Sequence, residues 1–143
     1  MVSQNDVILA DEWFFKAKQA LGFARTGLPE AQYHDWICFL CHQAVELYSK
    51  GLLVLHHIKP PRSHDLSELF TRCVVVDEGW ENLSFAAKTL APYYIESRYP
   101  LDVFEIRHYS REQAEEAVRL AGEIEEHIMN FRKEATISAR SNE

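Results

Sequence analysis

A cluster of polar side chains interrupts an otherwise apolar stretch of the chain. His42, Gln43, Glu46 and Lys50 are spaced so that an α-helix would place them along one side. Glu46 precedes Lys50 by one helical turn, which is the favourable order for an ion pair on a helix. An imidazole, an amide, a carboxylate and an ammonium group can together hold a polar ligand or a second copy of the chain. The alternative is an ordinary solvent-facing strip. We call these four residues the polar strip.

Three further polar residues have types suited to binding a phosphorylated ligand. Arg98 and Tyr99 directly precede Pro100, which favours the end of a helix because the residue before a proline avoids the α conformation. A guanidinium beside an aromatic ring is suited to a phosphate and a base, although such an arginine also caps helix carbonyls. His64 follows the Pro60-Pro61 loop and precedes the start of another expected helix.

Two patterns invite a metal or redox interpretation. Residues 38–42 read C-x-x-C-H, the pattern of covalent haem attachment and of some thiol sites. The pattern falls in the middle of an expected helix, which favours small buried cysteines. His56, His57 and His64 lie close in sequence, but adjacent histidines on a helix point about 100° apart and rarely reach one ion. We therefore predict no metal site. The Gly-rich nucleotide loops of the G-x-x-x-x-G-K-[ST] and G-x-G-x-x-G types are absent from the sequence.

Composition favours a cytoplasmic globular protein. The chain has 143 residues, 47% of them hydrophobic, and a formal net charge of −7. An acidic chain is a poor non-specific binder of nucleic acid, because phosphate neutralisation needs clustered Lys and Arg. Three cysteines cannot all pair within one chain, which favours a reducing compartment. We find no signal-peptide pattern and no apolar run near the ~20 residues of a membrane span.

Apolar periodicity predicts an all-α protein, an up-and-down bundle of about five helices. We expect one domain over residues 1–143, with a core over about 8–134 and a frayed tail at 135–143. Tyr33 to Lys59 is expected to form the central helix, because its apolar arc is wider than one buried face requires. The other expected helices are Ile8 to Arg25, Leu66 to about Val75, one from about Trp80 that Pro92 kinks or divides, and one from Ser110 to about Lys133.

Helix boundaries follow from short local signals. Asp65 with Glu68, and Ser110 with Gln113, have the spacing of capping boxes at helix starts. Residues 101–109 form the longest stretch expected to be non-helical, and we expect them to wrap around the bundle.

The order of these pieces resembles the HEPN family (higher eukaryotes and prokaryotes nucleotide-binding). The resemblance covers about Trp13 to Phe131. It is densest over residues 39–53, over His64-Asp65-Leu66 and over the run Ser97-Arg98-Tyr99-Pro100. It implies a helical bundle that is commonly a homodimer. Prokaryotic members often work beside a minimal nucleotidyltransferase, in toxin–antitoxin or nucleotide-transfer systems, and some bind nucleotides while others are metal-independent ribonucleases.

The resemblance favours the nucleotide-binding branch of the family. The ribonuclease branch uses an Arg followed by four to six residues and then a His. Here seven residues separate Arg119 from His127, and nine separate Arg98 from His108. We therefore expect an accessory protein rather than an enzyme.

Carried over by position, the resemblance implies a site for a nucleotide such as ATP, with no other cofactor. In that site Lys50 and Arg98 would meet phosphate, and Tyr99 would stack on the ligand or close the pocket. The expected site residues are Gln43, Glu46, Lys50, His64, Arg98 and Tyr99.

Two alternatives remain open at this point. The first is a ribonuclease that uses His42 or His64 as general base and Arg98 on the scissile phosphate. The second is a non-catalytic dimeric scaffold, in which the polar strip is only the seam between two copies.

Overall fold

The computed structural model describes residues 2–94 and 107–141, with the backbone alone for residue 31 and for residues 134–141. The described residues are mostly helical and contain no β-strand. The α-helices are α1 (Gln4–Gly27), α2 (His34–Leu55), α3 (Leu66–Val76), α4 (Ser84–Leu90) and α5 (Arg111–Ser141). Short 3-10 helices lie between them: η1 (Ala31–Tyr33), η2 (Glu78–Leu83) and η3 (Ala91–Tyr94).

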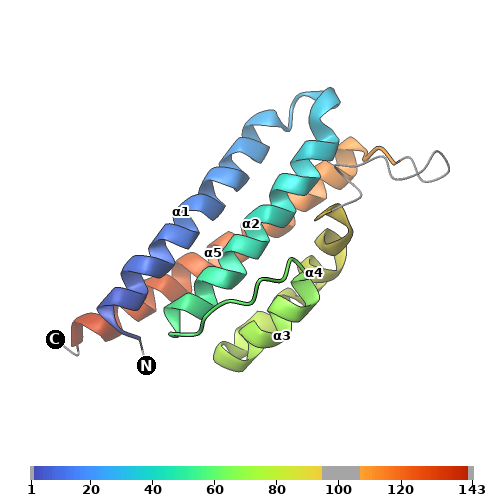
Figure 1. Cartoon of the computed structure of the whole chain (residues 1–143). Coiled ribbons are helices and arrows are strands. Elements are labelled where there is room, and N and C mark those ends of the chain that lie inside the picture. Colours follow the sequence, from blue (N-terminus) through green and yellow to red (C-terminus); the bar gives the residue numbers. More distant parts are fainter. Residues whose placement is uncertain (1, 95–106, 142–143) are drawn as a thin grey trace.

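The long helices α1, α2 and α5 lie side by side, and the shorter α3 and α4 cover one flank (Figure 1). α1 begins and α5 ends at the same end of the bundle. α2 contacts α1, α5, α3 and η3, and most of its residues are buried. The expected all-α bundle and its central helix are therefore confirmed. Within the described parts of the chain, no helix has the length and apolar character that crossing a membrane requires.

α1 approaches α2 closely where Gly51 of α2 faces Phe14 of α1. α1 begins at Gln4, where Ser3 and Asp6 form a reciprocal capping box. A Cβ atom added at Gly51 of α2 would lie 2.5 Å from Cε1 of Phe14 in α1. The absence of a side chain at Gly51 therefore sets the spacing of these two helices.

The central helix ends earlier than the sequence predicts. We expected it to continue to Lys59, but α2 ends at Leu55. His57 then adopts a left-handed backbone with φ of 60°, and the Ile58 N–H donates to the Leu53 carbonyl at 2.9 Å. A left-handed residue after the last turn closes a helix by satisfying its free carbonyl groups. His57, rather than the Pro60-Pro61 loop, ends α2.

The segment between α3 and η3 is divided into short helical pieces. Asp65 caps α3 by accepting from the backbone N–H groups of Ser67 and Glu68. The N–H of Asp65 donates to the Ser63 hydroxyl, so the expected reciprocal bond to Glu68 is replaced. The predicted helix from Trp80 is instead η2, α4 and η3, and the α-helical part stops at Leu90, two residues before Pro92. A proline lacks the N–H that would continue the ladder.

α5 closes the bundle and is longer than predicted. Ser110 and Gln113 form the expected capping box at its start. The helix continues to Ser141, beyond the expected end near Lys133. Arg132 makes two hydrogen bonds to the Asp11 carboxylate, at 2.6 and 2.8 Å, which tie α5 to α1.

Candidate functional site

Three members of the polar strip are buried in the bundle. His42 is fully buried, while Glu46 and Lys50 are 5% and 7% exposed. They occupy successive turns on one side of α2, so their side chains follow one another along the helix. The Lys50 ammonium lies 3.2 Å from the Glu46 carboxylate. The interpretation of a solvent-facing strip is therefore wrong for these residues, because α2 is covered on this side by the rest of the chain.

His64 completes this buried ion pair from outside α2. Its Nδ1 lies 3.0 and 3.1 Å from the two carboxylate oxygens of Glu46. A carboxylate only accepts, so Nδ1 carries the proton in this hydrogen bond. The next residue, Asp65, is the N-cap of α3, which fixes the backbone that carries His64. The His64 side chain is 49% exposed, so it connects the buried pair to the solvent-accessible surface.

Tyr94, at the end of η3, covers the cluster. The Tyr94 ring is stacked on the His64 ring, with centroids 4.6 Å apart and planes 15° apart. The same ring lies 5.3 Å from the His42 ring and 6.4 Å from the Phe39 ring. Two helix-terminal segments far apart in sequence thus meet over α2. We call His42, Glu46, Lys50, His64 and Tyr94 the polar cluster.

His42 is a neutral member of the cluster. Burial lowers the pKa of His42 to about 4, and the nearby Glu46 carboxylate opposes this shift without reversing it. Neither ring nitrogen has a hydrogen-bond partner among the described residues. His42 is therefore uncharged near neutral pH and contributes no positive charge for a phosphate.

The structure brings together part of the expected site. The Glu46 carboxylate contacts both Lys50 and His64. Gln43 is half-buried, and its Oε1 has no hydrogen-bond partner among the described residues. Arg98 and Tyr99 lie outside the described residues, as do residues 101–106 of the expected wrapping segment.

Tyr94 is the cluster residue that sequence reasoning assigned to another role. Its spacing from Ala87 and Leu90 predicts a place on the apolar face of the helix expected from about Trp80. Its position just after Pro92, close in sequence to the run Ser97 to Pro100, was the available signal.

Comparison with known proteins places this geometry in a family. The model of the HEPN domain matches residues 10–131. The chain belongs to the HEPN family. Among solved structures, the chain is similar to TT1696 from Thermus thermophilus, with 35% identity, a TM-score of 0.70, and coverage of 85% of this chain and 96% of that one. It is also similar to ST0689, an archaeal HEPN homologue, with 28% identity, a TM-score of 0.67, and coverage of 86% and 97%. The comparison with curated proteins gave no match.

The histidines near the end of α2 diverge in this HEPN chain. The Nδ1 atom of His56 lies 3.0 Å from the Leu52 carbonyl, and that of His57 lies 2.9 Å from the Asp6 carboxylate. His64 instead contacts Glu46. In the described ranges no three His, Cys, Asp or Glu side chains are grouped so that they could hold a metal ion.

The cysteines of the C-x-x-C-H pattern are buried in the HEPN core. Cys38 and Cys41 are fully buried and free, as is Cys73. Burial raises the pKa of Cys38 and of Cys73 to about 12, and raises that of Cys41 further. A thiol that stays protonated is a poor nucleophile and a poor metal ligand. These residues pack as small apolar side chains.

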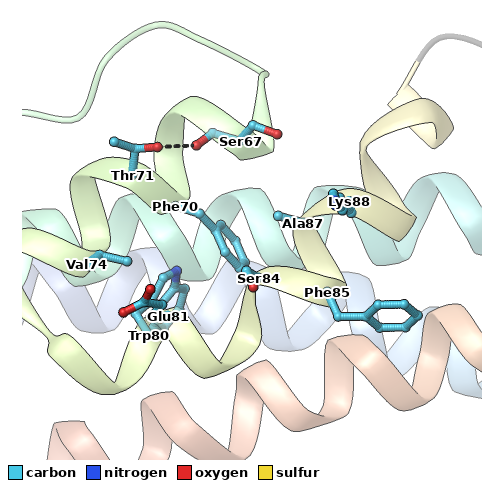
Figure 2. Close-up of a pocket in the computed structure, with 10 residues that line it drawn as sticks. All are labelled: Ser67, Phe70, Thr71, Val74, Trp80, Glu81, Ser84, Phe85, Ala87 and Lys88. Atoms are coloured by element: carbon cyan, nitrogen blue, oxygen red, sulfur yellow. Dashed lines mark hydrogen bonds between the residues drawn. The ribbon is translucent and has the colours of Figure 1, made fainter.

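Two hollows on the HEPN surface lie apart from the polar cluster. One, of about 520 Å³, lies where α1 ends and α2 begins, and exposed Phe23, Tyr33 and Trp36 line it. The other, also about 520 Å³, lies between α3 and α4 (Figure 2). Contiguous exposed apolar side chains on a folded protein indicate interaction surfaces.

Proposed function

We propose that this HEPN protein binds a nucleotide at the polar cluster and works beside a nucleotidyltransferase partner. The observation that carries the proposal is the contact of His64 with the buried Glu46–Lys50 pair. An ion pair removed from water costs free energy unless further hydrogen bonds compensate. His64 lies at the surface of such a pair, is half-exposed and is stacked on Tyr94, so it gives a ligand both a hydrogen-bonding edge and an aromatic face.

The chemistry of the cluster fits a phosphorylated, ring-bearing ligand. The Nδ1–H of His64 donates to Glu46, which leaves Nε2 of the neutral ring as an acceptor for a ribose hydroxyl or a base amino group. Lys50, paired with Glu46, supplies a positive charge within the cluster. Tyr94 and His64 offer ring surface on which a base can stack. We propose that Arg98 and Tyr99 add a second cation and a second ring, and that Gln43 orders the site by hydrogen bonding.

Calorimetric titration tests nucleotide binding. We expect ATP, or a related nucleotide in a series of ATP, ADP, AMP and GTP, to bind with Kd below about 100 μM. His64→Ala should weaken binding at least tenfold. The matched control is His57→Asn, which removes an exposed histidine outside the cluster at a left-handed position that Asn tolerates. No heat across the series with protein well above that concentration would contradict the proposal.

We also propose that the chain forms a homodimer through the hollow lined by Phe23, Tyr33 and Trp36. Three exposed aromatic side chains in one hollow are the residue types that dominate interfaces. Light scattering should give about twice the protomer mass of 16.6 kDa. Trp36→Ala should shift the mass toward one protomer, whereas Phe85→Ala, at the other hollow, should leave it unchanged. A monomeric wild type would contradict the dimer.

The ribonuclease alternative has less support from the geometry. A general base must reach the proton that it removes, but His42 is fully buried beneath Tyr94. His64 is accessible, so it is the residue to test. Incubation of RNA in EDTA with wild type and His64→Ala separates the two functions, because only a ribonuclease would lose cleavage in the variant.

A further inference from the structure

The ring of Tyr94 lies among three other rings. It is stacked on the His64 ring, with centroids 4.6 Å apart, and its centroid lies 5.3 Å from that of His42 and 6.4 Å from that of Phe39. Phe39 and His42 lie about one turn apart on α2, whereas His64 belongs to the loop before α3. These three side chains form a slot that holds one flat ring, and the Tyr94 ring fills it. We call this the ring slot.

Buried polar atoms without hydrogen-bond partners lie beside the ring slot. His42 is fully buried, and neither its Nδ1 nor its Nε2 atom has a partner in the described part of the chain. The Oε1 atom of Gln43 is also buried and has no partner there. The Gln43 side chain lies near the His42 ring, but the two groups do not meet hydrogen-bond geometry. Each such atom costs free energy, which a ligand with matching polar atoms would recover.

The edge of a nucleobase carries the polar atoms that these two residues lack. His42 is neutral near pH 7, so one of its ring nitrogens donates a hydrogen bond and the other accepts one. The amide oxygen of Gln43 only accepts. A donor beside an acceptor matches a base edge on which a ring nitrogen that accepts lies next to an amino group that donates. Adenine and cytosine have this edge, whereas guanine, hypoxanthine and uracil present a carbonyl oxygen beside an N–H group.

We propose that His42 and Gln43 select an amino-bearing base, adenine or cytosine, for the nucleotide at the polar cluster. The exocyclic amino group of the base donates to the Gln43 Oε1 atom. A ring N–H of His42 donates to the neighbouring ring nitrogen of the base. This inference rests on the proposed function, because it assigns the base end of the same nucleotide.

The base takes the place that the Tyr94 ring holds beside His42. The Tyr94 side chain can change rotamer while η3 stays in place, because the neighbouring residue Tyr93 is buried and anchors η3. The Tyr93 ring packs edge-on against the Tyr109 ring, with centroids 4.6 Å apart. After this change the Tyr94 ring covers the outer face of the base, where it still provides a stacking surface.

Calorimetric titration with a series of nucleoside triphosphates tests the selection. All of them carry the same triphosphate, but ATP and CTP have the amino edge, while ITP, GTP and UTP have the carbonyl edge. ATP and ITP form a matched pair, because their purine rings have the same size and differ at the edge. We expect ATP to bind at least tenfold more tightly than ITP, and CTP at least tenfold more tightly than UTP.

Two substitutions remove the polar atoms while keeping an apolar side chain in their place. In Gln43→Met and in His42→Leu, we expect the ratio of ATP affinity to ITP affinity to fall below about threefold. A residue that only supports the fold would weaken both nucleotides equally and leave this ratio unchanged. Gln19→Met, which replaces an exposed glutamine on α1, is the matched control and should keep the wild-type ratio.

The outcomes separate this inference from the proposed function. Affinity that follows ring size, with ATP, GTP and ITP alike and CTP and UTP weaker, would overturn the selection and leave nucleotide binding standing. An unchanged ratio in both Gln43→Met and His42→Leu would also overturn it. No heat from any of these nucleotides would contradict the inference and the proposed function together. Thermal unfolding of Gln43→Met at the wild-type temperature would show that a lost ratio is not a loss of fold.

Discussion

The Lys50 ammonium lies 3.2 Å from the Glu46 carboxylate, and both side chains are more than nine-tenths buried. The helix α2 thus carries a full ion pair into the interior of the bundle. Burying two charges removes their hydration, and the attraction between them offsets that loss only while both partners are present. His64 supplies one further hydrogen bond to the carboxylate. This cost of burial is the physical basis of the binding role that we propose for the pair.

Removing one partner of the buried pair should destabilise the fold. We expect Lys50→Met to lower the free energy of unfolding by roughly 3 kcal/mol, because it leaves the Glu46 carboxylate buried with His64 as its remaining partner. The double variant Lys50→Met/Glu46→Gln should lose less than the single one. Urea unfolding measures both. Arg72→Met, in an exposed pair with Glu68, should lower the free energy of unfolding by under about 1 kcal/mol. A loss equal to that of Lys50→Met would contradict the assignment of Glu46 and Lys50 as a buried pair.

Gly51 should tolerate no side chain. A Cβ atom there would lie 2.5 Å from Cε1 and 2.8 Å from Cδ1 of Phe14, so Gly51→Ala must displace the Phe14 ring or push α1 away from α2. We expect a loss of about 1–3 kcal/mol in the free energy of unfolding. Gly22→Ala, in the middle of α1 with no atom within 4 Å of the added Cβ, should raise stability by about 0.5–1 kcal/mol. Thermal unfolding that ranks the two variants in the opposite order would refute this packing.

His42 should make stability depend on pH. Its folded pKa of about 4 lies below the ordinary value of 6.5, so between these values the unfolded chain binds more protons. The stability linked to neutral His42 is fully present above about pH 6.5. As pH falls to about 4, the free energy of unfolding drops by roughly 3 kcal/mol in total. His42→Leu should flatten this part of the profile. Urea unfolding at about pH 7 and about pH 5 on both proteins measures the difference, and parallel profiles would contradict the neutral, buried state of His42.

The helices of this fold were predictable because their apolar periodicity is strong. In α1, α3 and α5, apolar residues recur at the three- and four-residue spacing of a helix with one buried face. The starts of α3 and α5 are marked in the sequence by the capping residues Asp65 and Ser110. The end of α2 was not predictable. It depends on a left-handed histidine, His57, where glycine is the usual signal.

The candidate site was predictable in part. The helical spacing of Glu46 and Lys50 was visible in the sequence, but their burial was not, because it depends on segments that fold over α2. The contact between His64 and Glu46 spans 18 residues and exists only once α3 docks. Tyr94 gave no polar signal, since a tyrosine on an apolar face is commonly a core residue.

The most direct measurement is the NMR titration of the histidine ring signals with ATP. The chain has seven histidines, and only His42 and His64 belong to the polar cluster. We predict that saturating ATP moves the ring signals of His64 and His42 and leaves those of His57 and His108 in place. Absence of any shift, or shifts at His57 and His108 with His64 unmoved, would contradict a nucleotide site at the Glu46–Lys50 pair.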